Sequence, residues 1–266
     1  YYFPGRPEKP VVYLHGGFDS TTEECYFFGG AALIERGYPV VMFEGPGQSS
    51  MIIDYGVRFT PDWHKPVGKV MDFMEAKDPG LSVKKKILYG ASMGGILAGR
   101  AAAFEKRLDG VVLFGAPYDM VKAALFQMPA LGRWMYHRGW DGVINAMIGF
   151  KARGDRGLRW GLNNGTWTIG GNTPYDMLTQ FAPYTLEDVQ EKVKCHVLCL
   201  YGEKDIYVSD ERQRSLFESS FKNTASYTMK IFTEKDGAAE HCQVGSIEHA
   251  IGAFVGWMKD KGLDRL

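Results

Sequence analysis

The chain has 266 residues, of which 45% are hydrophobic and 23% are charged, and this ordinary globular composition excludes extensive disorder. Its 31 Lys and Arg residues balance 31 Asp and Glu residues, so the formal net charge is zero and nothing in it indicates a nucleic-acid partner. No apolar run reaches the roughly 18 residues of a membrane-spanning helix, so we expect no membrane partner. The length fits one α/β domain with an insertion.

Short apolar runs alternate with helical patterns along most of the chain. Several runs are apolar at nearly every position, as in strands that are buried on both faces of a parallel sheet. The alternation therefore predicts an α/β fold with a doubly wound, mostly parallel sheet. The predicted strands are Val11–His15, Val40–Glu44, Ile87–Tyr89, Val111–Phe114, Val197–Tyr201 and Tyr227–Phe232, and the predicted helices are Thr22–Arg36, Pro61–Lys77, Met93–Glu105, Asp210–Phe221 and Gln243–Lys261.

Residues 117–187 interrupt this alternation, because they contain no convincing strand. They hold four of the six tryptophans, and their apolar residues recur at helical spacing with a break expected at Pro129. Since long insertions in compact domains are usually functional, we interpret this segment as a helical cap over the active edge of the sheet. A packed helical insertion with only core aromatics is the alternative. The expected organisation is a core formed by residues 1–116 and 188–266, with the cap between them.

The strongest chemical signal is the run Gly90-Ala91-Ser92-Met93-Gly94, which follows a predicted strand and opens a predicted helix. This is the G-x-S-x-G pattern in the strand–turn–helix context that it requires. The glycines leave room for a strained turn that exposes the serine hydroxyl, and the helix N-terminus offers free N–H groups to an oxyanion. We therefore predict Ser92 as a nucleophile.

A second run, Leu14-His15-Gly16-Gly17-Phe18, follows the first predicted strand, where a loop rich in glycine can approach a substrate closely. An oxyanion hole needs two donors. We assign one to the N–H of Met93 and the other to the N–H of Phe18 or Gly17, and we expect His15 to brace the loop.

A serine hydroxyl needs a base, which an acid in turn orients, and in this fold the chain order is serine, acid, histidine. Asp205 follows the strand Val197–Tyr201, with Glu203 as its rival, whereas Asp210 suits a helix cap. His241 lies between the last strand and the last helix. The predicted triad is Ser92, His241 and Asp205.

These motifs resemble those of the α/β-hydrolases that include 2,6-dihydroxypseudooxynicotine hydrolase and the fungal pigment-pathway hydrolases that shorten polyketides. The resemblance implies an α/β-hydrolase fold, and it covers the sheet from Val11 to the last helix but not the cap. Two departures are Glu44, where the family commonly has Asp, and Ser49, where it commonly has Gly. The matching pieces are His15–Gly17 with Glu23-Glu24, Phe43–Gln48, Pro61–Trp63, Gly90–Gly95 with Arg100–Ala103, and Glu240–Gln243.

The resemblance also implies a small-molecule substrate, with hydrolysis of a carbon–carbon bond next to a ketone in an aromatic or polyketide-like compound. Such a reaction needs an additional acid or polar clamp, for which the candidates in the cap are Asp119, His137 and Asp141. The cap aromatics, such as Trp134, suit a flat substrate. A carboxylesterase or acylaminoacyl-type peptidase is the first alternative, and a catalytically silent ligand-binding protein on the same fold is the second.

Three further expectations concern the surroundings of this core. The chain begins Tyr1-Tyr2-Phe3-Pro4 without Met, and it lacks the family's helical N-terminal region and any hairpin before the first predicted strand. The strand Val40–Phe43 would then be an open apolar edge, so we expect an upstream domain or a second copy in a homodimer to cover it. The four cysteines form no CxxC pair, which favours a cytoplasmic protein. No metal-ligand cluster and no nucleotide-binding glycine loop occurs, so we expect neither a metal nor a cofactor.

Overall fold

The computed structural model describes residues 1–208 and 211–265, and its centre is a seven-stranded sheet with the order β1-β3-β2-β4-β5-β6-β7. All neighbouring strands are parallel except β1 and β3, which are antiparallel. The prediction of a doubly wound, mostly parallel sheet is therefore confirmed. The strands are β1 (Tyr2–Phe3), β2 (Val11–His15), β3 (Val40–Met42), β4 (Lys86–Ala91), β5 (Gly110–Phe114), β6 (His196–Gly202) and β7 (Ser226–Phe232).

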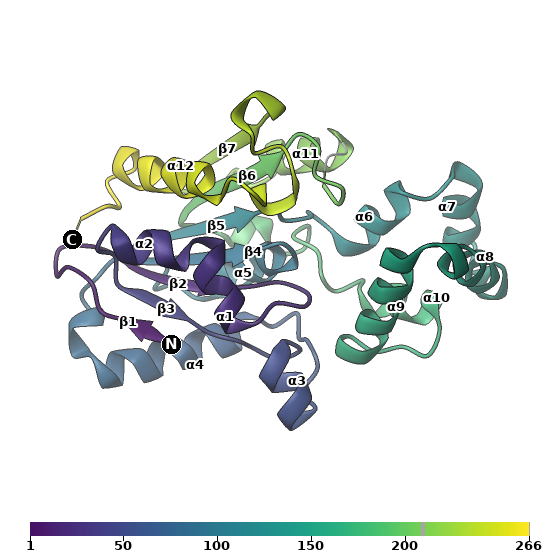
Figure 1. Ribbon diagram of the computed structural model, residues 1–266, viewed down its shortest axis with the longest axis horizontal. Helices are drawn as coiled ribbons and strands as arrows, with labels where there is room; N and C mark the ends of the chain where they lie inside the picture. Colours follow the sequence, from purple (N-terminus) through teal and green to yellow (C-terminus); the bar gives the residue numbers. More distant parts are fainter. Residues whose placement is uncertain (209–210, 266) are drawn as a thin grey trace.

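Helices cover both faces of the sheet (Figure 1). Side chains of α2 and α12 join one apolar core, and those of α4, α5 and α11 join the other. Successive residues of the central strands point into opposite cores, which explains why these strands are apolar at every position. The helices of the core are α1 (Thr22–Cys25), α2 (Ala31–Glu35), α3 (Ser49–Tyr55), α4 (His64–Lys77), α5 (Met93–Phe104), α11 (Glu211–Glu218) and α12 (Ile247–Asp260), with short helical turns at Tyr26–Gly30, Pro79–Leu81, Gln190–Lys192, Glu234–Asp236 and His241–Gln243.

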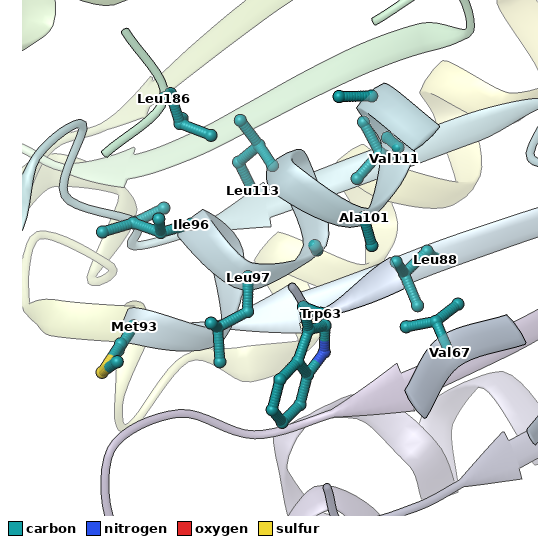
Figure 2. Packing of buried hydrophobic residues seen from close by; sticks show 14 of the residues in the cluster. Trp63, Val67, Leu88, Met93, Ile96, Leu97, Ala101, Val111, Leu113 and Leu186 are labelled. Carbon is teal, nitrogen blue, oxygen red and sulfur yellow. The ribbon is translucent and has the colours of Figure 1, made fainter. Parts of the chain in front are cut away.

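Nearly every residue of α5 is buried, which fixes the start of this helix rigidly. Figure 2 shows Ile96, Leu97 and Ala101 of α5 packed among side chains of β4, β5 and the α4 region, with Trp63 beneath them. Trp63 is fully buried. The helix that begins at Met93 therefore cannot shift without disturbing the core.

One predicted helix is divided in the structure, and one observed helix was not predicted. The segment predicted as one helix over Thr22–Arg36 is interrupted by the turn at Tyr26–Gly30, because Gly29 adopts φ = 125°, which no helix accommodates. Helix α3 was not predicted at all. The helix predicted from Asp210 is α11, whose described part begins at Glu211; the capping role expected for Asp210 lies outside the described residues.

The expectation that no segment remains to pair with the edge strand is wrong. Tyr2 and Phe3 pair with Val41 and Val40, and the backbone of Tyr1 exchanges hydrogen bonds with that of Met42. A two-residue strand satisfies part of the edge of β3. That an upstream domain or a second copy covers the outer side of β1 stays a prediction.

Five helices between β5 and β6 form a separate group at one end of the sheet, beyond the carboxyl ends of the strands (Figure 1). Pro129 lies just before the second of these helices and separates it from the first, as expected from the sequence. A bridge between Asp119 and Thr185 joins the beginning and the end of this group, which we call the cap. Its helices are α6 (Met120–Phe126), α7 (Ala130–His137), α8 (Asp141–Gly154), α9 (Arg156–Thr168) and α10 (Pro174–Gln180). Of the helices in the described residues, none combines the length and the apolar character that crossing a membrane requires.

Candidate active site

Ser92 occupies the sharp turn between β4 and α5. Its backbone adopts φ = 57° and ψ = −130°, a sparsely populated conformation that costs about 1–3 kcal/mol. The Ser92 N–H donates to the carbonyl of Phe114 on the neighbouring strand at 2.7 Å, which holds the turn in place. Glycine is required at position 90, because a Cβ there would lie 2.1 Å from the Gly94 carbonyl oxygen. A Cβ on Gly94 would likewise lie 2.3 Å from the Gly16 carbonyl oxygen, so the pattern reflects a lack of space two residues before and two residues after the serine.

The structure brings Ser92, His241 and Asp205 together from three distant parts of the chain. The Nε2 atom of His241 lies 2.9 Å from the Ser92 hydroxyl, and its Nδ1 atom lies 2.7 Å from Asp205 Oδ2. Asp205 is fully buried, and its Oδ1 atom accepts the N–H groups of Tyr207 and Val208. The carboxylate is therefore fixed, and with Nδ1–H donated to it, Nε2 is free to accept the serine proton.

Glu203, the rival acid, does not reach the histidine. It is exposed, and its carboxylate accepts the N–H of Glu234. The two acids thus differ in burial, because Asp205 is fully buried beside His241, whereas Glu203 is exposed.

The surroundings of His241 favour its protonated form. Burial by itself lowers the pKa of His241, but the hydrogen bond and charge of Asp205, together with the contact to Cys242, outweigh burial and raise the pKa above the ordinary value of histidine. The Cys242 sulfur lies 3.6 Å from His241 Nε2 and 3.6 Å from the Phe114 carbonyl oxygen. The ring of Tyr207 meets the imidazole edge-on, with 4.8 Å between ring centroids.

The loop after β2 is braced from behind by His15. Its Nδ1 atom lies 3.0 Å from the Gly16 carbonyl, and its Nε2 atom accepts the indole N–H of Trp63 at 3.2 Å. An acceptor at Nε2 and a donor at Nδ1 define a neutral ring. Burial agrees with this assignment, because it lowers the pKa of His15 to about 4.

Sequence reasoning missed the role of Gln48, which is buried and joins two loops. Its Nε2 atom donates to the carbonyls of Gly16 and Gly17 at 2.6 and 3.0 Å, and its Oε1 atom accepts the N–H of Gly45 at 2.9 Å. The preceding Glu44 accepts the N–H of Thr22 at 2.7 Å. Gln48 belongs to the Glu44–Gln48 run, which contributed to the family resemblance. That resemblance could have pointed to Gln48, although the sequence indicated no physical role for it.

The two candidate donors of the loop differ in their hydrogen bonds. The N–H of Gly17 donates to the Ser20 hydroxyl at 2.8 Å, so it is already engaged. The N–H of Phe18 has no acceptor in the part of the chain that the structure describes. The loop lies directly against the serine turn, since a Cβ on Gly17 would stand 3.0 Å from Ser92 Cβ and 3.1 Å from the nitrogen of Met93. As the first residue of α5, Met93 has no acceptor for its N–H within the helix.

Asp19 is a further residue of this region that the sequence did not single out. It follows Phe18, and although it is exposed on one side, desolvation raises its pKa, while the charge of His241 acts in the opposite direction. Desolvation also raises the pKa of Tyr207, and the charge of Asp19 adds to this effect. The charge of Asp19 therefore interacts with both His241 and Tyr207.

Within the described residues, none of the four cap residues predicted to contact substrate forms a hydrogen bond or ring contact with Ser92, His241 or Asp205. Asp119 is buried and caps α6 by accepting the N–H of Lys122 at 2.7 Å. His137 and Asp141 are exposed at the end of α7 and the start of α8, and these two helices lie on the side of the cap away from the sheet (Figure 1). Trp134 packs against Trp140, with 5.2 Å between ring centroids.

Comparisons with known proteins agree with this architecture. The family model "Serine aminopeptidase, S33" matches residues 5–234. "Hydrolase acrC" of Aspergillus aculeatus is 35% identical over 217 residues, which cover 79% of this chain and 50% of that protein. "20-hydroxy-prefusarin hydrolase FUS2" of Gibberella moniliformis is 32% identical over 224 residues, which cover 81% and 52%.

Among solved structures, the 2,6-dihydroxy-pseudo-oxynicotine hydrolase superposes with a TM-score of 0.70 at 19% identity, covering 97% of this chain and 62% of that one. At this identity the likeness shows the fold alone. The chain spans about half the length of the two fungal relatives.

Proposed function

Because the chain belongs to the serine aminopeptidase S33 family of α/β hydrolases, we propose that it is a serine hydrolase acting through Ser92, His241 and Asp205. The observation that carries the proposal is the continuous hydrogen-bonded series from the Ser92 hydroxyl through both ring nitrogens of His241 to Asp205. We further propose that the bond cleaved is a carbon–carbon bond next to a ketone in an aromatic or polyketide-like substrate.

The chemistry proceeds in two halves. His241 Nε2 takes the hydroxyl proton as the Ser92 oxygen attacks the ketone carbon, and the N–H groups of Phe18 and Met93 hold the resulting oxyanion. The carbon–carbon bond breaks, the leaving enolate or electron-rich ring takes the proton from His241, and an acyl-enzyme remains. Water, deprotonated by the same imidazole, then releases a carboxylic acid and restores Ser92.

One relative supports this choice of substrate, since its name, 20-hydroxy-prefusarin hydrolase, gives a hydroxylated organic compound as its substrate. A carbanion is a poor leaving group, so its departure needs a polar group beyond the triad. We assign this role to Asp19, because it follows an oxyanion donor and senses the charge of His241. This replaces Asp119, which the helix cap already engages.

An esterase or aminopeptidase is the second candidate, which the description of the matching family favours. The same triad would catalyse ester or peptide hydrolysis. Assays with p-nitrophenyl esters and with an aryl β-diketone distinguish these activities from carbon–carbon cleavage. Hydrolysis of short esters alone contradicts carbon–carbon cleavage. Hydrolysis of neither, with no labelling of the serine, favours a catalytically silent binding protein.

A fluorophosphonate that labels the wild-type chain tests the nucleophile directly. We expect a single adduct on Ser92, none in Ser92→Ala, and an unchanged adduct in the exposed control Ser219→Ala. Turnover should fall by several orders of magnitude in Ser92→Ala. Wild-type turnover in that variant would contradict the proposal.

A further inference from the structure

One face of helix α9 lines an open cleft of about 480 Å³ that the reaction above does not use. The face combines two guanidinium groups, two indole rings and two amides. Their spacing of three or four residues places all of them on one side of the helix. The six lining residues are Arg156, Arg159, Trp160, Asn163, Asn164 and Trp167.

The two arginines of this cleft lack counterions. Arg156 and Arg159 are exposed, and in residues 1–208 and 211–265 neither side chain forms an ion pair or a hydrogen bond. Both lie in the first turn of α9, after the capping residue Asp155, whose carboxylate accepts the N–H of Leu158 at 2.9 Å. Two like charges three residues apart repel each other. An anion bound between the two guanidinium groups would relieve this repulsion.

The indoles give the cleft a preference for flat rings. Trp160 and Trp167 are 46% and 48% exposed, which is unusual for so large an apolar surface and leaves their faces available to a ligand. Arginine beside an aromatic ring favours a planar anion, because the guanidinium offers paired N–H donors to a carboxylate.

The cleft adjoins the loop that carries a proposed oxyanion donor. The Trp160 ring meets the Phe18 ring edge-on, with 5.8 Å between centroids, and Asn164 donates to the Phe18 carbonyl at 3.1 Å. A ligand held on α9 therefore lies next to the loop that carries Phe18.

We propose that this cleft binds the carboxylate of an aromatic acid, so that the substrate of the site is an acidic, aromatic compound whose charged end rests on Arg156 and Arg159. The ring stacks between Trp160 and Trp167. The statement that the bound acid is the substrate rests on the proposed function. The statement that the cleft binds an aromatic acid depends only on the residues of α9.

Calorimetric titration of the whole chain in the Ser92→Ala background measures binding without turnover. The probes are 2-naphthoate and its neutral counterpart 2-naphthamide. We expect 2-naphthoate to bind about tenfold more tightly than the amide, because only the carboxylate pairs with the arginines. The double variant Arg156→Gln, Arg159→Gln should lose about tenfold in affinity for 2-naphthoate and leave the amide unaffected.

The matched control is Arg153→Gln, an exposed arginine of α8 outside the cleft, which should leave both affinities unchanged. Trp167→Leu should weaken both probes, since both use the ring. Arg159→Gln alone, with a melting curve, keeps the test valid if the double variant does not fold. Equal binding of acid and amide, equal loss in Arg153→Gln, or displacement by inorganic phosphate at the affinity of 2-naphthoate would each overturn the proposal. Because Ser92 is absent, these outcomes are independent of whether Ser92 is a nucleophile.

Discussion

The Nε2 atom of Gln48 lies 2.6 Å from the carbonyl oxygen of Gly16, and this bond ties the loop after β3 to the loop after β2. A second bond to Gly17 fixes the next carbonyl. A peptide plane whose carbonyl is held on one side must present its N–H on the other. The orientation of the Phe18 N–H, which shares the peptide plane of the Gly17 carbonyl, therefore depends on a side chain 30 residues away in the sequence.

Replacing this amide tests that dependence. Gln48→Ala removes both bonds, and we expect a loss of about 1–3 kcal/mol in the free energy of unfolding, because buried carbonyls are left without donors. We also expect a drop of about 100-fold in kcat, since the oxyanion donor is misplaced. Chemical denaturation and steady-state kinetics measure the two effects. Gln180→Ala, at an exposed glutamine, is the control, and unchanged kcat in Gln48→Ala would contradict the bracing role.

The pH dependence of turnover follows from the environment of His241. Only the neutral imidazole accepts the serine proton, so activity is lost as pH falls through its pKa. Because Asp205 raises this pKa, we expect the acid limb of kcat/KM above about pH 6.5, the ordinary value for histidine. An acid limb at or below that value in a pH–rate profile would contradict the assignment.

The same shift predicts how stability changes with pH. A pKa raised in the folded state means that folding favours the protonated ring, so this stabilisation is complete below about pH 6.5 and is lost as pH rises through the folded-state pKa. Urea denaturation of the wild type and His241→Gln should therefore show a smaller difference at about pH 9 than at about pH 6. A difference that grows with pH would contradict the direction of the shift.

Cys242 offers a separate test of the base. Its sulfur lies 3.6 Å from Nε2, and its contact raises the pKa of His241. Cys242→Ala should therefore move the acid limb to lower pH. The protein should remain folded, because the left-handed backbone at φ = 50° already carries a side chain. Cys195→Ala, before the opposite end of β6, is the control, and a limb that stays in place in Cys242→Ala would exclude an electrostatic role for the thiol.

Asp19 distinguishes the two reactions that the triad could perform. In Asp19→Asn we expect cleavage of an aryl β-diketone to fall by about 10²-fold, because the departing carbanion loses the polar group that assists it beside His241. Hydrolysis of p-nitrophenyl esters should change little, since p-nitrophenolate leaves without protonation. Asp54→Asn, at an exposed aspartate of α3, is the matched control. Equal losses on both substrates would show that Asp19 acts on the loop rather than on the leaving group.

Local sequence patterns were enough to predict the sheet and the family of this protein. The apolar strands, the glycines around Ser92 and the order of Ser92, Asp205 and His241 predicted a doubly wound α/β-hydrolase fold, and this prediction is confirmed. Each of these signals is a short-range property: a strand buried on both faces must be apolar throughout, and a tight turn must be bordered by glycine.

The tertiary structure decided the role of each polar group, because that role depends on which hydrogen-bond partner the group meets. The sequence left Gly17 and Phe18 equal as donors, and they differ only because the Ser20 hydroxyl folds back onto Gly17. It offered Asp119 as a substrate ligand, and in the structure one oxygen of that carboxylate caps helix α6.

The fold also created features that no single segment of the sequence contains. Tyr2 and Phe3 find an edge to pair with, and the indole of Trp160 comes to rest against Phe18, 142 residues earlier in the chain. Hydrogen-bond partners and electrostatic neighbours are set by distances in space, whereas sequence periodicity reports only which face of an element is buried. The chemistry that this chain is equipped for could therefore be predicted from its residues one motif at a time, but the choice of acid, donor and ligand-binding face required the folded molecule.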